Sequence, residues 1–138
     1  MTSTLAAYAE TINEAWNSHD IEKVLSFYSP DYVGDDVGQA SLLRGHEGLR
    51  AMLENYWSAF PDLRFKVTST LVEGDRLAIV WLGEGTHQGT IMNIPPTGHK
   101  VEARGVSIIE VRDGLIVSGQ YIWDLAGMLR HMGLLPEL

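Results

Sequence analysis

The spacing of hydrophobic residues changes along this chain, from helical spacing in the first part to alternation in the second. Near the N-terminus, Leu5, Tyr8, Ile12 and Trp16 recur every three or four residues. This pattern predicts an amphipathic helix that ends near Asn17.

Two further helices are expected before the change of pattern. Asp20 can cap a short helix over residues 21–25, which Pro30 closes. Apolar residues at helical spacing between residues 49 and 60 predict a longer helix, which Pro61 ends. The segment between these two helices is expected to be a short strand or loop.

Four alternating or apolar runs follow the third helix, punctuated by Gly, Asp and Pro: residues 63–74, 76–89, 100–114 and 115–124. They predict one twisted antiparallel sheet of meander type. Helices first and strands afterwards indicate an α+β fold in which the helices cover one face of the sheet. With no repeat and no linker, residues 1–138 are expected to form a single domain.

Composition narrows the choice of function. The chain has 138 residues, enough to bury roughly two thirds of its surface and still enclose a cavity. Its 18 acidic and 10 basic residues give a net charge of -8, which disfavours nucleic acid and anionic membranes as partners. The N-terminus lacks a basic region and no run of apolar residues is long enough for a membrane span, so a cytoplasmic location is expected.

Metal and thiol chemistry are not expected. The chain has no cysteine, which excludes thiol catalysis and thiolate metal sites. Its five histidines are scattered and lack the spacing of paired metal ligands. The sequence therefore predicts no metal and no cofactor.

One carboxylate stands at the junction of the last strand and a terminal helix, in "GQYIWDLAGMLRHMGLLP" (residues 119–136). Asp124 fits two roles there, the N-cap of the helix or a general acid or base that points into a pocket. A capping box is absent because the residue three positions later is Gly127.

The neighbours of Asp124 follow from strand alternation, which puts Gln120 and Ile122 on its face and Tyr121 and Trp123 on the other. Its partners on the preceding strand depend on the turn at residues 112–114. A two-residue turn leaves Arg104 on the opposite face, whereas a three-residue turn with a bulge pairs Arg104 with Ile122. We favour the bulged turn, which makes Arg104 a pocket cation beside the acid.

His87 is a further candidate. It shares its strand face with Trp81 and two glycines, so it is able to project into a cavity beside Asp124. A lone strand histidine is also commonly a structural residue. Asp35 and Asp36, which follow Tyr32, are expected to be exposed to solvent.

Four segments carry a resemblance to a known family: "AFPDLRF", "GTHQGTIMNIPPTGHKVEARGVSI", "VRDGLIV" and "WDLAGMLRHMGLLP". In order and spacing they resemble the SnoaL-like polyketide cyclases and ester cyclases of the nuclear transport factor 2-like superfamily, from about residue 5 to residue 136. The resemblance implies a conical α+β barrel, in which a curved antiparallel sheet wraps a deep pocket closed by the N-terminal helices.

The resemblance also implies an activity. Founding members of the family cyclise aromatic polyketide esters by intramolecular aldol condensation without metal or cofactor, and their catalytic aspartate falls on Asp124. Gln120, His87 or Arg104 would then polarise the substrate carbonyl. The substrate would be an apolar, polyketide-like small molecule. Aromatic and apolar side chains are expected to line its pocket, namely Trp16, Tyr32, Tyr56, Trp81 and Ile122.

Two alternatives remain open. Isomerases and epoxide hydrolases share the superfamily fold, although Val106 stands where a second strand aspartate of the hydrolases would be expected. A non-catalytic protein that binds small molecules or serves as a dimeric scaffold is the other. In either case a homodimer through the convex sheet face is expected, because Leu115, Val117, Tyr121 and Trp123 would leave that face strongly apolar.

Overall fold

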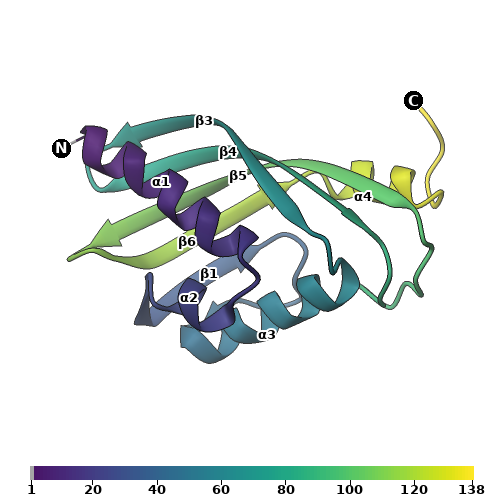
Figure 1. The fold of residues 1–138 in the computed structure, drawn as a ribbon, viewed down its shortest axis with the longest axis horizontal. Coiled ribbons are helices and arrows are strands. Elements are labelled where there is room, and N and C mark those ends of the chain that lie inside the picture. Colours follow the sequence, from purple (N-terminus) through teal and green to yellow (C-terminus); the bar gives the residue numbers. More distant parts are fainter. Residues whose placement is uncertain (1) are drawn as a thin grey trace.

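The computed structural model describes residues 2–138, with side chains from residue 5 onward. Helix α1 (Thr2–Asn17) lies across the sheet and buries Ala9, Ile12 and Ala15 beneath it (Figure 1). Helix α2 (Ile21–Leu25) is capped by Asp20, whose Oδ1 accepts from the Lys23 N–H at 3.2 Å. Both helices lie where their sequence patterns predict them.

A single six-stranded sheet forms the body of the molecule, in the order β2-β1-β6-β5-β4-β3. Its strands are β1 (Tyr28–Asp36), β2 (Leu43–Arg44), β3 (Arg64–Glu73), β4 (Arg76–Thr86), β5 (Lys100–Arg112) and β6 (Leu115–Trp123). The last four form the predicted antiparallel meander. The sheet is curved and open, because β2 and β3 are its two edges (Figure 1). The predicted α+β fold is confirmed.

Strand β1 is the main element that the pattern left undecided. It pairs in parallel with β6, and its register shifts between Tyr28 and Val33. Pro30 lies inside this irregular stretch, which suits a residue without an N–H donor. Pro30 therefore belongs to a strand, and does not directly close the short helix as expected.

Two further helices pack against the sheet, one beside β1 and one beside β5. Helix α3 (Gly45–Ala59) packs against β1 and buries Leu49, Met52 and Leu53. Helix α4 (Leu125–His131) lies next to the first residues of β5 (Figure 1). The core thus lies between α1, α3 and the concave sheet face.

The β5–β6 hairpin differs from both predicted registers. Asp113 and Gly114 have φ of 51° and 78°, so they form a tight two-residue turn, and Arg112 pairs with Leu115. The register then shifts, because Glu110 pairs with Ser118 while Val111 pairs with Ile116. Residue 117 is therefore the extra residue of a β-bulge, and the side chains after it change faces.

The bulge decides which side chains of β6 face the core. Tyr121 is 7% exposed and turns inward, whereas Ile122 is 50% exposed and Gln120 is also on the surface. The expectation that Tyr121 and Trp123 lie on the outer face is therefore wrong. A different apolar row crosses that face, formed by the register partners Val80, Val106 and Ile122.

Candidate active site

A cavity of about 130 Å³ lies between α1, α3 and the concave face of the sheet. This volume is the space open to the centres of water molecules, and each water needs about 10–15 Å³ of it, so the cavity holds roughly ten waters. Since a water occupies about 30 Å³ in the liquid, a ligand of about 300 Å³ would fill the same space. This size is at the low end for small-molecule sites. The wall is mainly apolar and includes Ile12, Met52, Phe60, Phe65, Ile79 and Ile109.

Alternation along β4, β5 and β6 turns Trp81, Ser107 and Tyr121 into this cavity. The Trp81 Nε1–H donates to Ser107 Oγ at 2.9 Å, which fixes the indole against the sheet. Gly105 is required beneath it, because a Cβ there would lie 2.4 Å from the Trp81 ring. A flat aromatic wall is the result.

Asp36, the last residue of β1, supplies a buried carboxylate in this wall. Its side chain is 4% exposed and accepts three hydrogen bonds. Oδ1 accepts from the Gly38 N–H at 2.7 Å and from the Trp123 Nε1–H at 2.9 Å, and Oδ2 accepts from the Tyr56 hydroxyl at 3.0 Å. Donors from the turn after β1, from α3 and from β6 therefore hold the carboxylate in place.

Tyr56 on α3 is held as a donor in this cluster. Burial raises the pKa of Tyr56, and the nearby charge of Asp36 raises it further, so its hydroxyl keeps its proton. The Tyr56 ring also packs edge-on against Trp123, with 6.3 Å between the ring centroids. The two side chains that donate to Asp36 thus support each other.

A second polar cluster lies deeper in the cavity. The Trp16 Nε1–H donates to the Tyr28 hydroxyl at 3.1 Å, and both side chains line the wall. The hydroxyl of Tyr121, which also lines it, is hydrogen-bonded to the hydroxyl of Tyr32. Burial raises the pKa of Tyr28, Tyr32 and Tyr121, so these phenols are neutral.

Asp124 does not line the cavity. Its Oδ1 accepts from the Gly127 N–H at 2.9 Å, which makes it the N-cap of α4. Gly127 makes room for this, because a Cβ at that position would lie 2.4 Å from Asp124 Oδ2. The glycine that removes the capping box is thus what lets the carboxylate fold over the helix end.

Arg104 lies directly opposite Asp124, whose N–H donates to the Arg104 carbonyl at 2.8 Å. Their side chains approach to 3.8 Å on the outer face, where the Arg104 side chain is 83% exposed. The predicted pairing of Arg104 with Ile122 is wrong, and so is the placement of Arg104, Gln120 and Ile122 in the pocket. The bulge in β6 turns Gln120 and Ile122 outward, whereas Arg104 lies on the outer face of β5, between the inward residues Ala103 and Gly105.

His87 is fully buried but lies outside the cavity wall. Its Nδ1 accepts from the Thr97 N–H at 3.1 Å, so the proton of the neutral ring is on Nε2, which has no partner among the described residues. Its backbone pairs with His99 and Gly98 across the loop that joins β4 to β5. These contacts favour the structural interpretation of His87.

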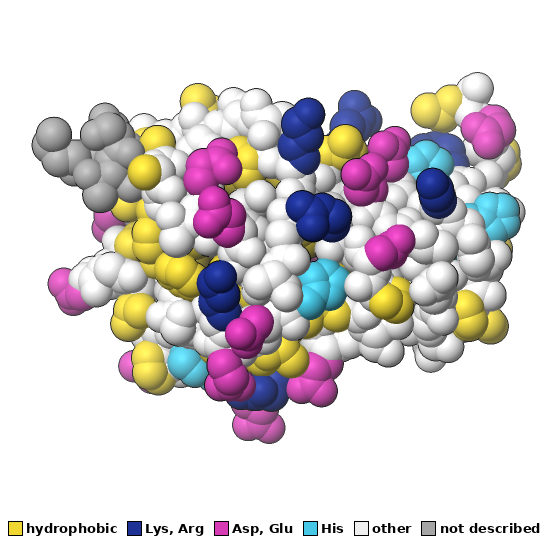
Figure 2. Space-filling model, viewed as in Figure 1, with side chains coloured by type: hydrophobic (Ala, Val, Ile, Leu, Met, Phe, Trp, Pro, Cys, Tyr) yellow, Lys and Arg dark blue, Asp and Glu magenta, His cyan; other side chains and the backbone are white. Residues whose placement is uncertain are grey.

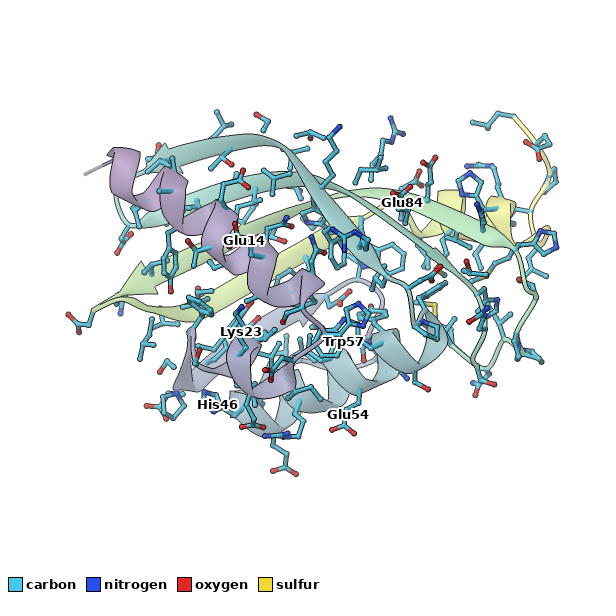
Figure 3. The ribbon with its side chains drawn as sticks, in the orientation of Figure 1. Glu14, Lys23, His46, Glu54, Trp57 and Glu84 are labelled. Carbon is cyan, nitrogen blue, oxygen red and sulfur yellow. The ribbon has the colours of Figure 1, made fainter. Side chains whose placement is uncertain are left out.

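The predicted aromatic residues divide into two groups. Trp16, Tyr56 and Trp81 line the cavity, whereas Tyr32 is buried behind Tyr121 and does not reach it. Glu84, which the sequence did not single out, reaches the cavity rim from β4 at the end of the sheet near α4 (Figure 3). Its side chain is exposed.

Asp36 is the residue that the sequence interpretation placed wrongly. Asp35 is exposed as expected, but Asp36 is buried. Two signals point to it in retrospect: Tyr32, Gly34 and Asp36 alternate as on the inward face of a strand, and Asp36 precedes Gly38 by two residues, the spacing of an Asx turn.

The surface of the described residues carries charges of both signs. Figure 2 shows acidic and basic side chains scattered over one face without a basic patch. Among residues 2–138, no three His, Asp or Glu side chains lie together in a way that would hold a metal ion. Within the same residues no helix combines the length and apolar character needed to cross a membrane.

Solved structures of similar shape are numerous. AclR from Streptomyces galilaeus, a proposed hydroxylase, is 28% identical with a TM-score of 0.87, over 100% of this chain and 90% of AclR. IdmH from Streptomyces antibioticus, a proposed polyketide cyclase, is 30% identical with a TM-score of 0.78, over 90% and 94% of the two chains. A protein from Catenulispora acidiphila with a ketosteroid isomerase-like fold, 16% identical with a TM-score of 0.79 over 91% and 92%, shares the fold.

The curved sheet, the covering helices and the apolar cavity between them define this protein as a member of the ketosteroid isomerase-like fold class. No curated protein matches the chain by sequence. The family model of the SnoaL-like polyketide cyclases matches residues 6–132. The chain therefore belongs to the SnoaL-like polyketide cyclase family, as its sequence motifs predict.

Proposed function

We propose that this protein closes a ring in an aromatic polyketide ester by an intramolecular aldol-type reaction, with Asp36 as the acid and base. The observation that carries the proposal is the buried Asp36 carboxylate in the wall of a mainly apolar, aromatic cavity. Family membership and the likeness to IdmH support a polyketide as the substrate.

Asp36 has the acceptor capacity that the reaction needs. A carboxylate offers about four lone-pair sites, and three of those on Asp36 are occupied. The remaining site takes the proton from the carbon next to a substrate carbonyl, which leaves an enolate. The enolate carbon attacks a second carbonyl carbon of the same molecule, and the resulting alkoxide takes the proton back from Asp36.

This sequence of steps is balanced without a partner molecule. One carbon–carbon bond forms, one proton moves to Asp36 and returns, and no electron is gained or lost overall. The cavity contributes by holding the flexible chain with its two reacting carbons close together, which lowers the entropic part of the barrier. The flat surfaces of Trp16 and Trp81 suit a planar aromatic substrate.

Asp36 and Asp124 are the two carboxylates that compete for the catalytic role. Turnover of aromatic polyketide methyl esters by Asp36→Asn and Asp124→Asn separates them. We expect Asp36→Asn to lose about 100-fold or more in rate, as is typical for loss of a general acid or base, and Asp124→Asn to remain near the parental rate. Asp35→Asn is the matched control, because Asp35 is adjacent but exposed.

The opposite pattern would reject the assignment. If Asp124→Asn loses the activity and Asp36→Asn keeps it, the aspartate implied by the family resemblance is the catalytic one. Circular dichroism and thermal unfolding of each variant establish that a lost rate is not a lost fold.

One observation favours a second candidate function, the binding of a polyketide without turnover. Three donors hold Asp36 in place, which suits a carboxylate that orients a ligand as well as one that exchanges protons. A carrier would bind the ester in a 1:1 complex and return it unchanged. Calorimetry together with mass analysis of the bound ester distinguishes the carrier from the cyclase.

A further inference from the structure

Three buried tyrosines meet at the inner end of the cavity. Tyr28 comes from the start of β1, Tyr32 from the middle of β1 and Tyr121 from β6. The hydroxyls of Tyr32 and Tyr121 are hydrogen-bonded, and the Tyr28 ring packs edge-on against the Tyr32 ring with 5.0 Å between the ring centroids. Glycines make space for the cluster, since a Cβ at Gly119 would lie 2.8 Å from the Tyr121 hydroxyl and 2.9 Å from that of Tyr32.

The cluster has more protons than acceptors. Three phenols carry three hydroxyl protons, and the hydrogen bond between Tyr32 and Tyr121 uses one of them. The Trp16 N–H adds another donor, which occupies an acceptor site on Tyr28. At least one hydroxyl proton is therefore left without an acceptor inside the cluster.

The geometry indicates where this proton points. Tyr32 does not line the cavity, and Tyr121 is the one hydrogen-bond partner of its hydroxyl among the described residues, so the arrangement that leaves no Tyr32 proton unpaired has Tyr32 as the donor to Tyr121. Tyr28 and Tyr121 both line the cavity, which leaves one of these two hydroxyls to donate into it. A buried donor without a partner is costly, so the cavity should be filled by something that accepts a hydrogen bond at this point.

The chemical state of the phenols suits this role. Burial raises the pKa of all three, mainly through loss of hydration, so they stay protonated at neutral and mildly alkaline pH. They are donors to an oxygen, and not general bases.

We propose that Tyr28 and Tyr121 form an oxygen-binding subsite that donates a hydrogen bond to the ketone or enolate oxygen of a planar aromatic ligand. Tyr32 is a positioning residue, because it touches Tyr121 and not the cavity. The identity of the oxygen as an enolate rests on the proposed aldol reaction, whereas binding of a ketone does not.

The subsite complements Asp36 in the same cavity. When the Asp36 carboxylate takes a proton from carbon, its negative charge moves to the substrate oxygen. Phenol hydroxyls placed at that oxygen stabilise the charge where it develops, as in other sites with preorganised donors. The cavity then keeps the same net charge through the step.

The test uses 2-acetylnaphthalene as an inert ketone probe and 2-ethylnaphthalene as its matched hydrocarbon. In the wild-type protein the infrared carbonyl stretch of the bound ketone is expected well below its value in an alkane solvent. Tyr28→Phe or Tyr121→Phe should move it back toward the alkane value and weaken ketone binding by about threefold to tenfold, the usual range for one hydrogen bond. Binding of the hydrocarbon should not weaken.

Two further variants define the result. Tyr8→Phe is the control, because the Tyr8 hydroxyl donates to the Gly114 carbonyl outside the cavity, and it should change neither value. Tyr32→Phe should shift the carbonyl stretch by an intermediate amount, which a residue with only a packing role would not do. If either cavity variant fails to fold, the wild-type spectrum decides alone, since a bound ketone at its alkane frequency overturns the proposal.

The outcomes separate this proposal from the aldol reaction. A shifted carbonyl stretch in a protein that turns over no polyketide ester supports the subsite and rejects the cyclase. Ester turnover that survives in both Tyr28→Phe and Tyr121→Phe, with an unshifted ketone, rejects the subsite and leaves the cyclase standing.

Discussion

Removal of the α4 cap at Asp124 has an effect that can be worked out from the structure. Asp124→Ala loses the 2.9 Å bond from the Gly127 N–H, which costs about 1 kcal/mol at a helix N-cap. The Arg104 contact adds little, because a 3.8 Å ion pair with an 83% exposed partner is screened by solvent. For a chain of 138 residues, a loss of about 1 kcal/mol lowers the melting temperature by roughly 3–4 °C.

Thermal and urea unfolding of a small set of variants test this value. Asp124→Asn keeps a side-chain oxygen acceptor and should remain within a few tenths of a kcal/mol of wild type. Gly127→Ala should lose stability as Asp124→Ala does, because the new Cβ displaces the carboxylate. Asp20→Ala, which removes the equivalent bond in α2, provides the reference for an ordinary cap. The reasoning fails if Asp124→Ala melts at the wild-type temperature, or if Asp124→Asn lowers the free energy of unfolding as much as Asp124→Ala does.

Three other predictions follow from the packing. Because burial raises the pKa of all five tyrosines above the ordinary value of 10.0, the stability they contribute is fully present below pH 10 and is lost as the pH rises toward their folded-state values. Absorbance of the native protein should therefore show no normal tyrosine ionisation near pH 10, and a normal titration would contradict this. Gly105→Ala should lower the free energy of unfolding by about 1–3 kcal/mol, because the new Cβ overpacks against Trp81. Urea unfolding measures this loss, and an unchanged unfolding midpoint would show that the indole moves aside freely. Light scattering should give a dimer of the 15.3 kDa chain that Val106→Arg disrupts, because Val106 is central to the outer apolar row; a wild-type monomer at micromolar concentration would refute it.

Much of the fold is predictable because local pattern and burial agree. The stripe over α1 and the alternation over β3 to β6 each follow from one buried face. Strand β1 has no decisive sequence pattern, because it contains Pro30 and is paired on both sides, so its side chains do not alternate in a simple way. Its parallel pairing with β6 depends on contacts distant in sequence, which no local pattern contains.

The site was less predictable, for a specific reason. Assignment of β6 side chains to faces assumed unbroken alternation from Leu115 to Asp124, and residue 117 breaks it. A bulge on a central strand has no strong sequence signal when the extra residue, Val117, is β-branched like Ile116 before it. Asp36 was missed for a related reason, since an Asp-x-Gly turn resembles an exposed loop until the packing of Tyr56 and Trp123 around it is known.

The single extra residue at position 117 also has a consequence for how this family can diversify. Because the bulge takes up this extra residue, Tyr121 and Trp123 stay on the inward face, and deletion of residue 117 would leave them there. If the strand instead kept residue 117 and ran without a bulge, Gln120 and Ile122 would turn inward and Tyr121 and Trp123 outward. The Tyr121 hydroxyl and the indole that binds Asp36 would then both leave the cavity wall. Whether one extra residue is taken up as a bulge or by continued alternation therefore decides the chemistry inside this cavity.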